Sequence, residues 1–132
     1  MARILVVDDE TAVRLTVRMI LENAGHTVVA AEGGHDAVSA IEAFSFDVLL
    51  VDIFMPGMDG LQTIRIFRES APEVPIIAMS GYALRGETMP DFFLRALELG
   101  AVVCLCKPFN SRELISALAT CGVCASSDAQ VA

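Results

Sequence analysis

Short apolar segments alternate with amphipathic helical patterns along the whole chain, and this alternation constrains the fold more than any other feature. Five such units follow one another. The third apolar segment, DVLLVD at residues 47–52, is apolar between its two aspartates, as expected of a central strand covered by helices on both faces. Strands that alternate with helices are typical of an α/β domain with a parallel sheet. We therefore predict a (βα)5 domain whose strands lie in the order 2-1-3-4-5.

The expected boundaries follow from turn residues and periodicity. The expected strands are residues 3–7, 26–31, 47–52, 75–79 and 102–106. The first helix should run from about Thr11 to a stop at Gly25, the fourth should span residues 91–99, and the fifth should begin near Asn110 or Ser111. Apolar faces define the other two helices, which carry Ala37, Ile41 and Phe44, and Leu61, Ile64 and Phe67. We expect one domain at residues 1–122 and a disordered tail at residues 123–132.

Composition excludes several classes of protein. The net charge of −8 argues against direct nucleic-acid binding, because neutralising phosphates requires clustered lysine and arginine. The longest apolar runs, such as residues 4–7 and 48–51, are far shorter than the roughly 20 residues that cross a bilayer. An amino terminus with Asp8 and Asp9 does not resemble a secretory or transit peptide. We predict a cytoplasmic protein that does not bind membranes and keeps its cysteines reduced.

Polar side chains follow four of the predicted strands. Asp8 and Asp9 come after the first strand, Asp52 ends the third, Ser80 follows the fourth, and Lys107, the single lysine of the chain, follows the fifth. Ligands of doubly wound sheets bind outside the carboxyl ends of the strands, at the switch in strand order. These side chains should therefore share one crevice.

The chemistry of that crevice points to phosphoryl groups. At an effective dielectric constant of about 20, each close pair of carboxylates repels by several kcal/mol, so positive charge is required. Mg²⁺ binds carboxylates, carbonyls and waters and leaves positions for phosphate oxygens, and Lys107 adds a mobile positive charge. Each residue alone has an ordinary explanation as a helix cap, a turn residue or a solvated charge. Their combination indicates a phosphoryl site that uses Mg²⁺.

Four segments match one family closely: LVVDDE at residues 5–10, DVLLVDIFMPGMDG at 47–60, IIAMSGY at 76–82 and CLCKPF at 104–109. Over about residues 2–122 the chain resembles the CheY-like receiver domain of two-component response regulators. The resemblance implies a flavodoxin-like three-layer sandwich and a phosphoprotein of phosphorelay signal transduction. It also implies no enzymatic activity beyond Mg²⁺-dependent self-phosphorylation and slow autodephosphorylation.

The resemblance also assigns roles within the site. Asp52 would be the phosphoacceptor, taking its phosphoryl group from a histidine kinase or a histidine phosphotransfer protein. Ser80 would hydrogen-bond the phosphoryl group, and Lys107, with a cis bond to Pro108, would pair with Asp52 at rest. The implied Mg²⁺ ligands are Asp8, acting mainly through water, Asp9, Asp52 and the backbone carbonyl of Phe54. The signal would pass to a downstream target protein through the face of the fourth helix, fifth strand and fifth helix, with homodimerisation left open.

This chain departs from the family pattern at Cys104 and in the segment at residues 81–93, and it has aromatic residues at two positions that vary in the family. Cys104 stands three residues before Lys107, where the family usually has an aromatic residue that takes part in switching. The segment at residues 81–93 is longer than usual, and we expect it to form the output surface together with the fourth helix. Phe54 and Tyr82 flank the predicted pocket, where two aromatic rings should exclude water and prolong the life of the phosphoryl group.

Other interpretations are weaker. An aspartate-nucleophile phosphohydrolase typically needs a second acid two residues after the nucleophile, where Phe54 stands. A flavin-binding domain would hold a phosphate at its first loop, which the acidic DDE would repel. A non-phosphorylated module leaves the full set of site residues unexplained, and a zinc site at Cys104, Cys106, Cys121 and Cys124 is not required, since buried cysteine often acts as a small hydrophobe. A receiver domain belonging to a larger transcriptional or enzymatic regulator fits as well as a single-domain protein.

Overall fold

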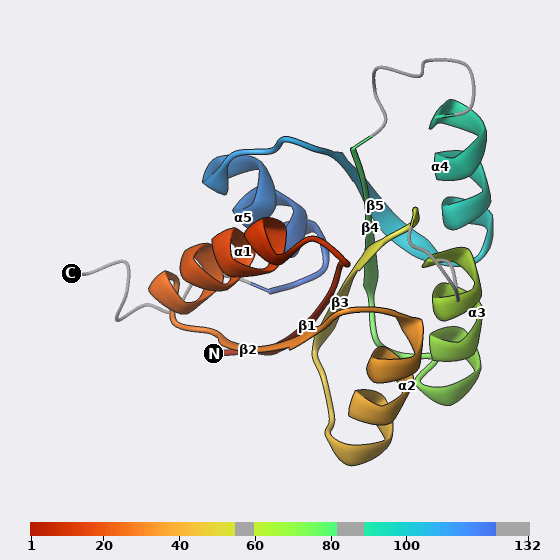
Figure 1. Cartoon of the computed structure of the whole chain (residues 1–132), viewed down its shortest axis with the longest axis horizontal. Helices are drawn as coiled ribbons and strands as arrows, with labels where there is room; N and C mark the ends of the chain where they lie inside the picture. The colour runs from red at the N-terminus through yellow and green to blue at the C-terminus, as the bar shows by residue number, and fades with distance from the viewer. Residues whose placement is uncertain (55–59, 82–88, 124–132) are drawn as a thin grey trace.

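The computed structural model describes residues 1–54, 60–81 and 89–123 and confirms the predicted α/β fold. Five parallel strands form one sheet in the order β2-β1-β3-β4-β5, with helices on both faces (Figure 1). The strands are β1 (Arg3–Val7), β2 (Thr27–Ala31), β3 (Val48–Asp52), β4 (Ile76–Ser80) and β5 (Ala101–Cys106). The helices are α1 (Thr11–Asn23), α2 (Gly34–Ala43), α3 (Gly60–Ser70), α4 (Met89–Glu98) and α5 (Ser111–Thr120).

The helices divide into two layers that cover opposite faces of the sheet. In Figure 1, α1 and α5 lie on one side and α2, α3 and α4 lie on the other. Alternate residues of β3 supply both interfaces: Leu49 and Val51 pack in the core cluster with α2, α3 and α4, whereas Val48 and Leu50 pack with α1 and α5. Burial on both faces explains why β3 is an apolar run, and each such side chain stabilises the fold by about 1.5–3 kcal/mol. None of the helices within the described ranges is long and apolar enough to cross a membrane.

Local sequence signals set the helix ends. Gly25 has a φ of 92°, so the predicted stop after α1 is confirmed at a residue that adopts the left-handed conformation without strain. At the start of α5, the Asn110 side chain accepts a hydrogen bond from the Glu113 amide at 2.8 Å, and the Glu113 side chain accepts one from the Asn110 amide at 3.1 Å. This capping box fixes the direction in which the chain leaves the loop after β5.

The prediction that Phe44 lies in the core was wrong. Phe44 was expected on the buried face of the second helix, but α2 ends at Ala43, and Phe44 has an extended φ of −137° and is 49% exposed. Its ring instead meets Phe46 edge to face, with centroids 6.3 Å apart, and lies 5.5 Å from the Arg3 guanidinium. The buried member of this aromatic pair is Phe46, which is 7% exposed. The expected tail beyond residue 123 lies outside the described residues.

Candidate functional site

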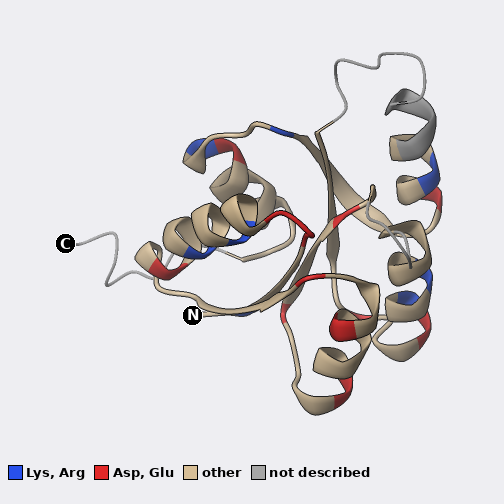
Figure 2. Ribbon diagram, viewed as in Figure 1, with Lys and Arg blue, Asp and Glu red and all other residues tan. Residues whose placement is uncertain are grey.

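The carboxyl ends of the central strands bring the predicted polar residues together. Asp52, at the end of β3, is paired in register with Met79 of β4, and Ser80, at the end of β4, is paired with Cys106, the residue before Lys107. Figure 2 shows the acidic stretch that follows β1 beside the acidic end of β3. Parallel strands all end at the same edge of a sheet, so residues far apart in the chain share this edge.

Lys107 is the centre of the site. Its Nζ atom lies 2.6 Å from Asp8 Oδ2, 3.0 Å from Asp52 Oδ2 and 3.3 Å from Glu10 Oε1. The lysine side chain is 10% exposed, and those of Asp8 and Asp52 are 0% and 4% exposed. The expected Lys107–Asp52 pair is therefore present, and the ammonium group also bonds two carboxylates that were not predicted as its partners.

Backbone amides hold the two buried carboxylates in place. The Glu10 amide donates to Asp8 Oδ1 and the Phe54 amide donates to Asp52 Oδ1, both at 2.9 Å. Each carboxylate therefore presents one oxygen to an amide and the other to Lys107. The lysine is itself anchored, because its backbone amide donates to the Ser80 carbonyl at 2.7 Å. The bond between Lys107 and Pro108 is cis, as the family resemblance implied.

Burial and charge act against each other in the electrostatics of the site. Burial raises the pKa of Asp52 to about 6, and hydrogen bonding by the Phe54 amide and the charge of Lys107 offset only part of that effect. Burial likewise raises the pKa of Asp8, although its hydrogen bond to Lys107 opposes this. Burial disfavours the charged lysine, but hydrogen bonds to and charges on Asp8 and Asp52 outweigh it and raise the pKa of Lys107. Near pH 7 Asp52 is therefore mostly ionised beside a fully charged lysine.

The acidic cluster has the composition of a metal site. Asp8, Asp9, Glu10 and Asp52 can each offer an oxygen, and these atoms lie within 4.8 Å of one another. One lysine cannot neutralise this many carboxylates, and carboxylate oxygens are the ligands that hard divalent cations prefer. The cluster could therefore bind a metal ion. Glu10 was missing from the predicted ligands, although it is the third letter of the DDE that marks the loop.

Other predicted residues are located by the structure without a test of their roles. Ser80 is fully buried at the end of β4. Phe54 is only partly buried and packs against the core cluster beneath α2, α3 and α4. The phosphoryl-binding role of Ser80 and the metal-binding role of the Phe54 carbonyl remain predictions. Tyr82 and the rest of residues 82–88 lie outside the described part of the chain.

Cys104 lies on β5, opposite Ala78 of β4, where the family usually has an aromatic residue. Its thiol is half-buried and donates to the carbonyl of Phe93 in α4, with 3.8 Å between sulfur and oxygen. Burial raises the pKa of this thiol to about 11, so it is neutral at physiological pH. Within residues 1–54, 60–81 and 89–123 the group able to hold a metal is the acidic one. Cys124, which the zinc alternative included, is not among these residues.

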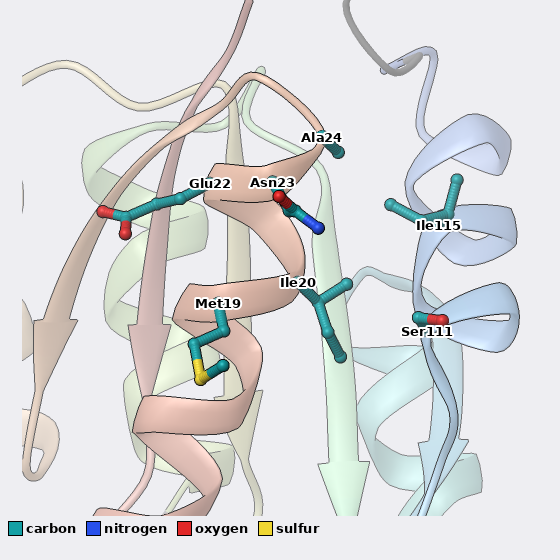
Figure 3. Close-up of a pocket in the computed structure, with 7 residues that line it drawn as sticks. All are labelled: Met19, Ile20, Glu22, Asn23, Ala24, Ser111 and Ile115. Atoms are coloured by element: carbon teal, nitrogen blue, oxygen red, sulfur yellow. The ribbon is translucent and has the colours of Figure 1, made fainter. Parts of the chain in front are cut away.

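Two hollows border α1. The first, of about 410 Å³, opens beside Lys107 and is lined by Glu10, Ala12, Val13, Thr16, Val17, Gly81, Lys107, Pro108 and Phe109. The second is a groove of about 730 Å³ between α1 and α5 (Figure 3). It is lined by Met19, Ile20, Glu22, Asn23, Ala24, Ser111 and Ile115. Only the first is continuous with the acidic cluster, since it shares Glu10 and Lys107 with it.

Comparison with known proteins matches this arrangement to a family. The family model described as the response regulator receiver domain matches residues 4–119. Two relatives are a sensor protein, GacS, of Pseudomonas syringae, 38% identical over 117 residues, and a protein-glutamate methylesterase/protein-glutamine glutaminase of Rhodospirillum rubrum, 40% identical over 114 residues. Each alignment covers 85% of this chain but only 12% and 29% of the respective relative. The chain thus spans less than a third of either protein.

Solved structures of receiver-like proteins match this chain over nearly its whole length. The chemotaxis protein CheY4 of Vibrio cholerae has a TM-score of 0.81 and 31% identity, with 90% of this chain and 97% of that chain covered. A CheY-like receiver domain protein of Methanospirillum hungatei has a TM-score of 0.82 and 30% identity, with 90% and 91% covered. The fold is therefore shared with proteins that are matched over nearly their whole solved chain, while the sequence also matches parts of larger proteins.

Proposed function

The chain belongs to the family of response regulator receiver domains, and we propose from this premise that Asp52 is the residue that accepts the phosphoryl group. The observation that carries the assignment is the buried ion pair of Asp52 with Lys107, inside a cluster of four carboxylates at the carboxyl edge of the sheet. Asp52 is the member of the cluster that is both at the end of a central strand and beside the lysine and Phe54. The family and the geometry thus support the same residue.

The chemistry follows from the contacts of Asp52. A carboxylate oxygen of Asp52 attacks the phosphorus atom of a phosphohistidine, the new O–P bond forms, and the P–N bond breaks with its electron pair leaving on the imidazole. The Phe54 amide holds Oδ1 in place, and the Lys107 ammonium faces Oδ2. Lys107 therefore stands where negative charge on the transferred oxygens develops, and such fixed charge in a dry site is an effective form of catalysis.

We assign the metal as Mg²⁺, on the basis of an all-oxygen cluster that matches its ligand preference. Its ligands would be Asp8, Asp9, Asp52 and the Phe54 carbonyl. When bound, Mg²⁺ would neutralise charge on the phosphoryl oxygens. Ser80, at the end of β4, is the proposed hydrogen-bond donor to one of those oxygens.

Two surfaces suit the proposed partners. The hollow beside Lys107 is mostly apolar, with Val13, Pro108 and Phe109 in its lining, and suits the entry of a histidine kinase or histidine phosphotransfer protein. On the face formed by α4 and β5, Leu94 is 57% exposed and Val102 is 45% exposed, and this apolar surface suits a downstream target protein. The cytoplasmic location expected from the sequence remains a prediction and homodimerisation remains open, and the relatives support a receiver within a larger protein equally well.

The test is self-phosphorylation with acetyl phosphate and Mg²⁺, read by intact mass. Wild type should gain about 80 Da, the mass of one phosphoryl group, and Asp52→Ala should gain nothing. Asp36→Ala, which removes an exposed aspartate from the first turn of α2, is the matched control and should gain the same mass as wild type. Equal labelling of Asp52→Ala and wild type would refute the assignment.

A further inference from the structure

Glu10 contacts Lys107 from outside the buried part of the site. We propose that Glu10 is a positioning residue that holds the Lys107 ammonium group when a divalent cation occupies the buried carboxylates. This inference rests on the proposed function for the location of the cation. It assigns to Glu10 a role that differs from metal binding, since Glu10 acts through the lysine.

The cation and the lysine compete for the same atoms. Lys107 forms ion pairs with Oδ2 of Asp8 and Oδ2 of Asp52, while Oδ1 of each carboxylate accepts a hydrogen bond from a backbone amide. A cation that binds these carboxylates would therefore approach the oxygens that Lys107 now occupies. Two positive charges at this distance in a buried site repel strongly, so the ammonium group must withdraw from at least one of them.

Glu10 is the carboxylate that remains available to the withdrawn ammonium group. Its Oε1 atom is already 3.3 Å from Nζ, and its side chain is 61% exposed, so the pair can form at the rim without further burial of charge. The exposed pair should contribute little in the resting state, where Asp8 and Asp52 hold the lysine. Its contribution should appear when the cation takes those oxygens.

The local backbone shows that the Glu10 side chain is not needed elsewhere. Glu10 is the N-cap residue of α1, but its side chain makes no capping hydrogen bond, which is the usual role of a side chain at that position. It points instead toward Lys107, and both residues line the same hollow of about 410 Å³. Gly81 lies beside the lysine stem, where a Cβ would be 3.6 Å from Lys107 Cδ. The hollow lined by both Glu10 and Lys107 gives the lysine space on the side toward Glu10.

The composition of the chain makes a direct experiment possible. Lys107 is the only lysine, so protein labelled with ¹⁵N-lysine gives one side-chain ammonium signal. An ammonium group held by carboxylates exchanges protons slowly with water and gives a sharp signal at low temperature, whereas a solvated one exchanges fast and is lost. The signal should be recorded for wild type and Glu10→Gln, before and after addition of Mg²⁺, with Glu42→Gln on the exposed face of α2 as the matched control.

Wild type and Glu42→Gln should keep the signal with and without Mg²⁺. Glu10→Gln should show it without Mg²⁺ and lose it on Mg²⁺ addition, and calorimetry should show about threefold weaker Mg²⁺ binding, the scale of one exposed ion pair. A signal that persists in Mg²⁺-loaded Glu10→Gln, or disappears in Mg²⁺-loaded wild type, would refute the positioning role of Glu10. Neither result would refute the proposed function. If wild type binds no Mg²⁺ by calorimetry, the cation site of the proposed function fails and this inference fails with it.

Discussion

Replacing Asp52 with asparagine is expected to make the protein more stable at neutral pH. The Asp52 side chain is 4% exposed, and burial raises its pKa from 3.8 to about 6, despite the opposing hydrogen bond from the Phe54 amide and the charge of Lys107. The ionised form is therefore less favourable in the folded protein than in the unfolded chain. Asparagine has nearly the same shape, keeps an oxygen for the Phe54 amide, and carries no charge.

The sign and size of this change in the free energy of unfolding follow from the linkage between proton binding and folding. A carboxyl group whose pKa is raised on folding binds its proton more tightly in the folded state, so its contribution is most favourable below the unfolded pKa of 3.8 and is lost as pH rises through about 6. The two pKa values differ by roughly 2 pH units, and at about 1.4 kcal/mol per unit the loss at pH 7 is about 3 kcal/mol. That figure already includes the attraction between Asp52 and Lys107, which lowers the pKa of Asp52, and in Asp52→Asn the lysine keeps its ion pairs with Asp8 and Glu10.

Urea unfolding in the presence of a metal chelator measures this difference. At pH 7 Asp52→Asn should have a free energy of unfolding higher than wild type by up to about 3 kcal/mol, with an unchanged m-value. At pH 4 the two proteins should be nearly equally stable, because Asp52 is then protonated in folded wild type. Glu42→Gln, which removes an exposed carboxylate from α2, should match wild type at both pH values. A variant less stable than wild type at pH 7, or a difference that does not change with pH, would refute the argument that burial dominates at Asp52.

Three other perturbations test the scaffold. Asn110→Ala removes the capping box that joins Asn110 to Glu113 and should lower the free energy of unfolding by about 1 kcal/mol in urea titration, without changing the mass gained from acetyl phosphate. Gly60→Ala would press a Cβ against the Asp52 carbonyl oxygen and should lower stability by at least about 2 kcal/mol in the same assay. Burial, with the nearby amino terminus, lowers the pKa of His26 below 6.5, so its neutral form is favoured in the folded state. Stability from this group is complete above pH 6.5 and lost as pH falls below it, so wild type should lose more stability than His26→Gln between pH 7 and pH 5.

The fold could be predicted because its signals are local and repeated. The apolar run of β3 predicts that the strand is buried on both faces. Gly25 predicts the end of α1, because glycine adopts the left-handed conformation without strain. The strand ends could then be placed at one edge of the sheet from topology alone. Phe44 was misplaced because its spacing fits the helical period, whereas the helix ends one residue earlier and the neighbouring Phe46 fills the core.

The contacts within the site could be predicted only in part. The sequence identified Asp8, Asp52 and Lys107 as neighbours. The ion pair of Lys107 with Asp8, however, depends on the rotamers of both side chains and on which carboxylate oxygen of Asp8 accepts the Glu10 amide. No pattern in one sequence contains that information. Glu10 was overlooked for a related reason, because an exposed acid before a helix is ordinary until its distance from Lys107 is known.

The burial that would make Asp52 reactive in the proposed function also makes its ionised form unfavourable for folding. A carboxylate in water would be a weak acceptor of a phosphoryl group, since water would solvate it and compete for the donor. Burial at the end of β3 excludes that water, but it raises the pKa of Asp52 toward neutrality. The hydrogen bond from the Phe54 amide and the charge of Lys107 together limit this rise in pKa, so the carboxylate is mostly ionised near pH 7. A single lysine is therefore sufficient for this site only if it stays near Asp52 both when a divalent cation is bound and when it is absent. The three carboxylates within 3.3 Å of Lys107 Nζ hold it there.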